Sequence, residues 1–187
     1  MITKANLEEA EKIYKEHMEY DFPDDENPDY ERYIKLTKEK KHNIYLYEKD
    51  NENVAYFITL EADNNILITH LAVMREHRSK GIGRVFLEDI KKYFMDKNII
   101  IVEVEAEVRA KNEEELNIIR RRKKYYVNGG FKECENLKYI LYDVDYDILS
   151  YSTQQQKIYK NIEMKEIIEK IYSKVGIKES KLKIEIV

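Results

Sequence analysis

The sequence predicts a mixed α/β fold in which helices and strands alternate along the chain. Three observations support this prediction. Several segments repeat apolar residues at helical spacing, other segments are rich in β-branched and aromatic residues, and capping or turn residues separate the two kinds. The predicted order is two helices, three strands, a helix, a strand, a helix and two strands. Such an order is typical of a layered α/β architecture.

The composition is that of a globular protein with one compact domain. The chain has 187 residues, 43% of them hydrophobic, and a formal net charge of −4. This charge balance argues against nucleic acid or an acidic membrane surface as a partner. The single cysteine, Cys134, cannot form an internal disulfide, and no apolar run approaches the roughly 20 residues of a membrane span. Because the first residues also lack the pattern of a signal peptide, we expect a cytoplasmic protein.

The first part of the chain is predicted to form two helices and three strands. Asn6 and Glu9 have the spacing of a capping box, so the first helix is expected to begin there and to end before the acidic loop "DFPDDENPDYE". The second helix is expected over residues 29–40. The three strands are expected in "NIYLYEKD", "VAYFITLEA" and "NNILITHLAVM", the first two of them joined as a hairpin.

The second part is predicted to begin with a helix after "SKGIG" and to continue with the strand "IIIVEVEAEV". Asn112 and Glu115 are expected to cap the next helix, and "KYILYDVDYDIL" supplies the last strands of a domain over residues 1–152. Residues 153–187 are expected to form an extension. It consists of one amphipathic helix with apolar positions from Ile158 to Val175, followed by the strand-like "KLKIEIV". We expect this extension to pack on the core or across a homodimer.

The stretch "HRSKGIGRVF" concentrates glycines and cations in a chain that has only five glycines. A strand, a glycine-containing loop and a helix in this order present unpaired backbone N–H groups to an anion, and the helix dipole adds positive potential. Gly81 and Gly83 lack a Cβ, so a phosphate could approach the chain closely and a positive φ costs little. Arg78 and Lys80 would add charge. The alternative is a basic loop with an ordinary glycine turn.

The segment from Arg78 to Gly83 resembles the acyl-CoA pyrophosphate loop of the GNAT superfamily of N-acetyltransferases, [Q/R]-x-x-G-x-[G/A]. Downstream, the segment from Tyr125 to Phe131, "YYVNGGF", resembles the second signature of that family, an aromatic–Tyr pair that ends a helix and is followed by Gly-Phe. The resemblance covers roughly residues 1–150. It implies a mostly antiparallel central sheet flanked by helices, with two central parallel strands that splay apart.

The resemblance also implies acetyl-CoA as cosubstrate, without a metal. The pantetheine arm would enter between the splayed strands, and the backbone N–H of Val73 would donate to the thioester oxygen as it gains negative charge. The implied cofactor-binding residues are Leu71, Ala72, Val73, Arg78, Ser79, Lys80, Gly81, Ile82 and Gly83.

Tyr126 matches the position of the general acid that is usual in this family, where it would protonate the departing thiolate. The residues themselves leave another interpretation open. Tyr126 shares a predicted helix face with Leu116 and Ile119, and the chain contains 16 tyrosines, so Tyr126 is also explained as a core residue.

The general base is expected among carboxylates of the strand "IIIVEVEAEV". Glu103, Glu105 and Glu107 alternate with apolar residues, and their shared face is expected to open on a cleft. Glu103 best matches the carboxylate that the family often carries there, and Glu105 is next. The alternative is an exposed, charged strand face. His70 is a third candidate, although a single strand histidine is usually structural.

The sequence therefore predicts an N-acetyltransferase that transfers the acetyl group to a primary amine, in a small molecule or in a peptide or protein. The acidic loop between the first two helices would attract a cationic acceptor, or it is an ordinary solvated loop. The cationic run 120–124 would reach a phosphate of CoA or an acidic substrate group, or it is a solvated face paired with Glu113, Glu114 and Glu115. The alternative function is a catalytically silent CoA-binding module or sensor.

Overall fold

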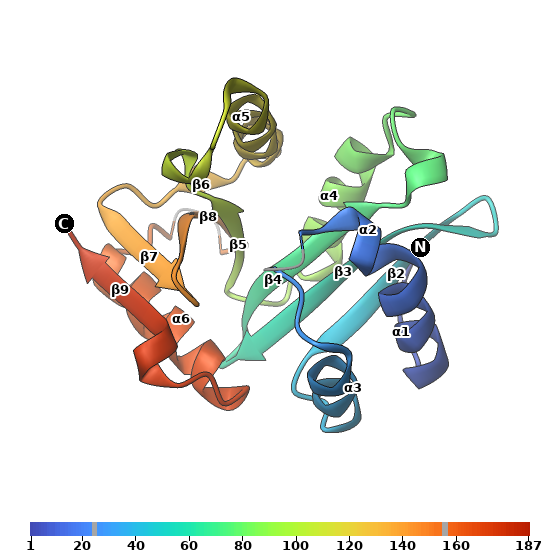
Figure 1. The fold of residues 1–187 in the computed structure, drawn as a ribbon, viewed down its shortest axis with the longest axis horizontal. Helices are drawn as coiled ribbons and strands as arrows, with labels where there is room; N and C mark the ends of the chain where they lie inside the picture. Colours follow the sequence, from blue (N-terminus) through green and yellow to red (C-terminus); the bar gives the residue numbers. More distant parts are fainter. Residues whose placement is uncertain (24–25, 155–156) are drawn as a thin grey trace. The chain divides into compact units, whose positions relative to one another are not determined.

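The computed structural model describes residues 1–23, 26–154 and 157–187, and it divides into two compact units (Figure 1). The first unit comprises Met1–Leu60 and Ile68–Tyr93, and the second comprises Glu61–Leu67 and Phe94–Val187. The strands follow the order β1-β2-β3-β4-β5-β8-β7-β9, with β6 beside β8. Strands β4 and β5 are parallel, whereas the other registered pairs are antiparallel. The predicted mixed and mostly antiparallel α/β fold is confirmed.

The first unit holds the N-terminal helices, most of the first four strands and the helix after the glycine loop. Its elements are β1 (Ile2–Lys4), α1 (Leu7–Ile13), η1 (Tyr14–Met18), α2 (Glu19–Asp21), α3 (Tyr30–Lys38), β2 (Asn43–Lys49), β3 (Glu52–Ala62), β4 (Asn65–Val73), η2 (Arg75–His77) and α4 (Ile82–Tyr93). The predicted capping box is present, because the Asn6 N–H donates to Glu9 Oε2 at 2.8 Å and the Glu9 N–H donates to Asn6 Oδ1 at 3.0 Å.

Helices cover both faces of the strands in this unit. On one face, apolar residues of α1 and α3 form a single buried cluster with alternate residues of β2 and β3, among them Ile44, Leu46 and Ile58. The intervening aromatic residues point to the other face, where Tyr47 stacks on Phe86 of α4 with ring centroids 4.8 Å apart. Strand β1 was not predicted, since three residues are too few to show a period and only the pairing with β2 defines the strand.

The second unit contains the remaining strands and the C-terminal segment. Its elements are β5 (Ile99–Glu105), η3 (Glu107–Arg109), α5 (Glu113–Asn128), β6 (Lys132–Glu133), β7 (Leu137–Leu141), β8 (Val144–Ser152), α6 (Asn161–Lys174), η4 (Glu179–Lys181) and β9 (Leu182–Ile186), together with the start of β4. Two predicted boundaries were wrong. Strand β5 ends at Glu105, so Glu107 lies in a 3-10 turn, and α6 begins at Asn161, so Ile158 precedes the helix and is 79% exposed.

The C-terminal segment is built into the second unit. Strand β9 pairs antiparallel with β7, from Leu137 opposite Ile186 to Leu141 opposite Leu182 (Figure 1). Helix α6 buries one face, which consists of Met164, Ile168, Ile171 and Tyr172. The described residues contain no helix that is both long enough and apolar enough to cross a membrane.

Two isoleucines of α6 allow a matched test of this packing. Ile168 is fully buried and Ile162 is 50% exposed. Ile168→Ala leaves a cavity and should lower the free energy of unfolding by about 3 kcal/mol. Ile162→Ala should change it by less than about 0.5 kcal/mol, since the change in helix propensity is the same for both variants. Urea unfolding of the full chain measures both. Equal effects would show that α6 does not pack as described.

Candidate functional site

The glycine loop joins the 3-10 turn η2 to helix α4 and is exposed from Arg78 to Gly81. Gly81 has a φ of +74°, and Ser79 has a φ of +63°. The backbone therefore turns through the left-handed region just before the first helical residue, Ile82. A Cβ placed on Gly81 would meet no heavy atom within 4 Å, so the space above this backbone is open. An exposed turn with open space at Gly81, at the N-terminus of a 12-residue helix, fits a large anion such as a pyrophosphate.

Arg78 makes contacts within the first unit that the sequence did not indicate. Its Nε donates to the Val73 carbonyl oxygen at 2.9 Å, and its guanidinium forms an ion pair with Asp21. The Asp21 side chain is 1% exposed and also accepts a hydrogen bond of 3.0 Å from the Tyr56 hydroxyl. These contacts tie the loop to the end of β4 and to α2. Lys80 is exposed beside the glycine turn.

The predicted pantetheine segment lies at the end of β4, immediately before η2. Ala72 is buried in the cluster beneath α1 and α3, whereas Leu71 and Val73 are partly exposed. This alternation places Leu71 and Val73 on the face opposite Ala72. The Val73 carbonyl is engaged by Arg78, so the loop and the strand end are held together.

Glu103 occupies a polar position inside the second unit. It lies on β5, and its Oε1 accepts hydrogen bonds from the hydroxyls of Tyr139 at 2.5 Å and Tyr172 at 2.7 Å. Burial raises the pKa of Glu103 to about 7, although both hydrogen bonds oppose that rise. A carboxyl group with this pKa exchanges a proton readily at neutral pH, as a general base must.

The tyrosines around Glu103 could not be found from the sequence. Tyr139 belongs to β7 and Tyr172 to α6, and they lie 36 and 69 residues from Glu103 along the chain. Neither residue is part of a local motif, and Tyr172 falls outside the region of family resemblance. From the sequence alone, a tyrosine at a buried helical position is predicted only to be a core residue.

The other two carboxylates of the predicted set have different surroundings from Glu103. Glu105 forms an ion pair with Arg122, and Glu107 forms one with Arg120, whose Nη2 lies 2.8 Å from Glu107 Oε2. Lys123 pairs with Glu133 at 2.7 Å and with Asp147 at 2.9 Å. These cations of the run 120–124 therefore reach β5, η3, β6 and β8. These ion pairs join the three cations to carboxylates of other elements, whereas one alternative was a pairing with Glu113, Glu114 and Glu115 of their own helix.

Tyr126 lies near the end of α5 and is partly buried. Its ring packs edge-on against Tyr125 at 5.1 Å and against Phe131 at 5.6 Å. Burial raises the pKa of the Tyr126 phenol to about 12, so it stays protonated at neutral pH. The second signature thus supplies a tyrosine hydroxyl that can donate a proton.

His70 is held within the first unit. Its Nδ1 lies 3.0 Å from Thr69 Oγ1, its Nε2 lies 3.3 Å from the Glu26 carbonyl oxygen, and its ring packs edge-on against Phe22. Burial lowers the pKa of His70 to about 4. A neutral imidazole with both ring nitrogens in contact with protein atoms is poorly suited to accept a proton from an amine.

Two carboxylates of the acidic segment 21–31, which joins α2 to α3, make contacts that stabilise the first unit. Asp21 is paired with Arg78, and Asp29 caps α3 by accepting a 2.8 Å hydrogen bond from the Arg32 N–H. Asp24 and Asp25 lie outside the described residues. At least these two carboxylates of the loop therefore stabilise the fold, which weakens the interpretation of the loop as a free acidic patch.

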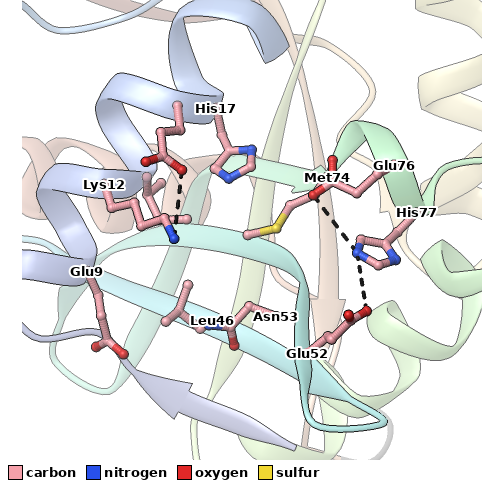
Figure 2. A pocket seen from close by; sticks show the side chains of 11 residues that line it. Glu9, Lys12, His17, Leu46, Glu52, Asn53, Met74, Glu76 and His77 are labelled. Carbon is pink, nitrogen blue, oxygen red and sulfur yellow. Dashed lines mark ion pairs between the residues drawn. The ribbon is translucent and has the colours of Figure 1, made fainter.

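A pocket of about 460 Å³ opens in the first unit (Figure 2). Carboxylates and histidines share its lining, and His77 lies 4.0 Å from Glu52 and 3.9 Å from Glu76. The lining residues are Glu9, Lys12, Ile13, Glu16, His17, Leu46, Glu52, Asn53, Met74, Glu76 and His77. None of the predicted catalytic or cofactor-binding residues is among them. Over the described part of the chain, no group of three or more His, Cys, Asp or Glu side chains could hold a metal ion.

The contact between Asp21 and Arg78 can be tested by stability. Asp21→Asn keeps the shape of the side chain but removes its charge, and the free energy of unfolding should fall by about 2 kcal/mol, the scale of a hydrogen bond to a charged group. Asp143→Asn is the control, because that carboxylate is 80% exposed and lies 3.7 Å from Lys181. The control should change stability by less than about 0.5 kcal/mol. Urea unfolding that gave the two variants equal stability would contradict the role of Asp21.

Three solved structures show the similarity of the fold. The first is from Bacteroides thetaiotaomicron and is described as a GNAT-family acetyltransferase; it is 18% identical with a TM-score of 0.79, over 95% of this chain and 99% of that one. The ribosomal-protein-S18-alanine N-acetyltransferase of Escherichia coli is 15% identical with a TM-score of 0.57, over 85% and 98%. Spermidine N-acetyltransferase from Vibrio cholerae, in complex with CoA and spermine, is 12% identical with a TM-score of 0.58, over 83% and 96%.

Family membership rests on the sequence. No curated protein matched the chain. A family model described as the acetyltransferase (GNAT) family matches residues 7–121, which is more than half of the chain and includes the whole glycine loop. The second signature, at residues 125–131, lies just beyond the matched region. The resemblance that the two motifs indicated is confirmed, and the chain belongs to the GNAT family of acetyltransferases.

Proposed function

We propose that this GNAT protein transfers the acetyl group of acetyl-CoA to a primary amine by direct attack in a ternary complex. Glu103 is the observation that carries the proposal. A carboxylate that is held by two tyrosine hydroxyls, with its pKa raised to about 7, is suited to remove a proton from an ammonium acceptor. A protein that only bound CoA would have no need of a proton acceptor poised at neutral pH.

The glycine loop is the proposed pyrophosphate site. The open backbone at Gly81 and the first N–H groups of α4 would donate to the phosphate oxygens, and the exposed Lys80 would add positive charge. Arg78, which is already paired with Asp21, would chiefly hold the loop in shape. The backbone N–H of Val73 is the proposed donor to the thioester oxygen.

The proposed chemistry needs a base at the acceptor nitrogen and an acid at the departing sulfur. Glu103 first takes a proton from the ammonium acceptor, directly or through water, and the free amine then forms its bond to the acetyl carbon. The second proton leaves the nitrogen through water, and it replaces the proton that Tyr126 gives up. The carbon–sulfur bond breaks, and the Tyr126 hydroxyl gives a proton to the departing sulfur. Burial keeps Tyr126 in its protonated form, which supports this role. Glu105 is a less suitable base, because its carboxylate is already engaged by Arg122.

The proposed acceptor class is a primary amine, either a small molecule or a peptide or protein amine. Two proteins of similar fold are named for such acceptors, spermidine in one case and the alanine of ribosomal protein S18 in the other. Release of the CoA thiol with polyamines, aminoglycosides and peptides tests the class, and the mass gained by the acceptor confirms acetyl transfer. If CoA binds but no amine is acetylated, the protein is a binding module.

Binding at the loop is tested by Gly83→Glu. A bulky, acidic side chain at the start of α4 should block the pyrophosphate, so acetyl-CoA affinity should fall at least 100-fold, or about 2.7 kcal/mol. The fold should survive, because glutamate is a better helix former than glycine. Val85→Glu adds the same charge at an exposed site on this helix and should cost much less affinity. Calorimetry measures both variants. Wild-type affinity in a folded Gly83→Glu protein would remove the loop from the proposed site.

The general acid is tested by Tyr126→Phe, which keeps the ring but removes the hydroxyl. The turnover rate should fall by roughly 10²–10⁴ while acetyl-CoA affinity changes little. Tyr142→Phe, at an exposed position, is the control and should keep wild-type turnover. Glu103→Gln should lose activity in a way that higher pH partly restores, because more of the amine is then already deprotonated. If Tyr126→Phe turned over at the wild-type rate, Tyr126 would not be the general acid and would serve only in packing.

A further inference from the structure

We propose that Tyr172, in the C-terminal helix α6, is a positioning residue for Glu103. The inference rests on the proposed function, in which Glu103 is the general base. It assigns a part in catalysis to the C-terminal segment, which lies beyond both the residues matched by the family model and the two signature motifs.

The hydrogen bonds to Glu103 are arranged asymmetrically. Tyr139 and Tyr172 both donate to the same carboxylate oxygen, Oε1, at 2.5 and 2.7 Å. The two donors therefore orient the carboxylate through one oxygen. Glu103 keeps partial exposure, whereas the two tyrosines are only 1% and 3% exposed.

The tyrosines are fixed donors. Burial raises the pKa of both phenols well above its ordinary value, so they remain protonated while Glu103 titrates. Their rings stack with centroids 6.5 Å apart, which restricts the direction in which each hydroxyl points. Tyr172 reaches this position because α6 buries Ile168 and Ile171 on the same face.

The hydrogen bonds also affect the pKa of Glu103. Burial favours the neutral acid, and each tyrosine hydroxyl favours the carboxylate. Other titratable groups around this site are Tyr146 of β8, whose ring lies 5.9 Å from that of Tyr139, and the ion pair between Glu105 of β5 and Arg122 of α5. Loss of the Tyr172 hydroxyl should therefore raise the pKa of Glu103.

Tyr172→Phe in the full-length protein tests the inference, first without any substrate. The pKa of Glu103 can be followed by NMR of ¹³C-labelled glutamate carboxyl groups, with the signal assigned from Glu103→Gln. We expect an upward shift of about one unit. Tyr139→Phe should shift it in the same direction and serves as a second variant if Tyr172→Phe folds poorly. Tyr159→Phe is the control, because this hydroxyl of the same C-terminal segment has no hydrogen-bond partner among the described residues.

The second readout is the pH dependence of kcat/KM on an accepted amine. Only the ionised form of Glu103 can accept a proton, so activity rises with pH through its pKa. In Tyr172→Phe this rise should move to higher pH by the same amount as the NMR titration, about tenfold in rate at pH 6 for a shift of one unit. Activity well above pH 8 should be largely retained. A purely structural role would lower activity equally at all pH values.

The failures of the two proposals are distinguishable. An unchanged Glu103 titration in folded Tyr172→Phe overturns the positioning role, whatever the activity. A shifted titration with an unmoved pH profile overturns it as well, because Glu103 is then not the base. Failure of the wild-type protein to acetylate any amine overturns the proposed function, and this appears before any variant is made. A shift in both readouts, with Tyr159→Phe unchanged, supports the inference.

Discussion

The second unit is organised around one carboxyl group placed in a largely buried position. Burying an ionisable group is costly unless hydrogen bonds compensate for the lost water. Glu103 obtains these hydrogen bonds from β7 and α6, so the strand order β5-β8-β7-β9 and the docking of α6 both determine its surroundings. Burial raises the pKa of Glu103 to about 7, and the two tyrosine hydrogen bonds oppose this rise. In this unit, what stabilises the fold also sets the proton affinity of the proposed base.

The first unit uses a buried carboxylate in a different way. Asp21 accepts from Tyr56 and pairs with Arg78, and Arg78 in turn donates to the Val73 carbonyl. Because a guanidinium has several donors in a fixed plane, one side chain can connect α2, the loop and the end of β4. Of the two cations expected to add charge at the loop, Arg78 is thus committed to protein contacts, whereas Lys80 and the open backbone at Gly81 are exposed.

In each unit a buried carboxylate is ion-paired or hydrogen-bonded: Asp21 in the first unit and Glu103 in the second. In the second unit, cations of α5 also pair with carboxylates of neighbouring elements, as Arg122 does with Glu105 and Lys123 does with Asp147. Ion pairs of this kind help to hold a helix against a sheet. Glu103 differs because its partners are neutral phenols, which orient a carboxylate without keeping it permanently ionised.

The sequence by itself determined the local features of this protein. Some features depend only on residues a few positions apart, so they can be predicted before the fold is known. They are the caps at Asn6 and Asn112, the positive φ at Gly81 and the helix after the loop. The family and the mixed α/β class followed from motifs of the same kind. The tertiary structure alone decided where β5 ends and which carboxylate each cation of α5 contacts. It also decided that Asp21 pairs with Arg78 and that Tyr172 donates to Glu103. These contacts join residues up to 69 positions apart, and no local period records them, because they arise only when strand pairing and helix packing bring distant segments together.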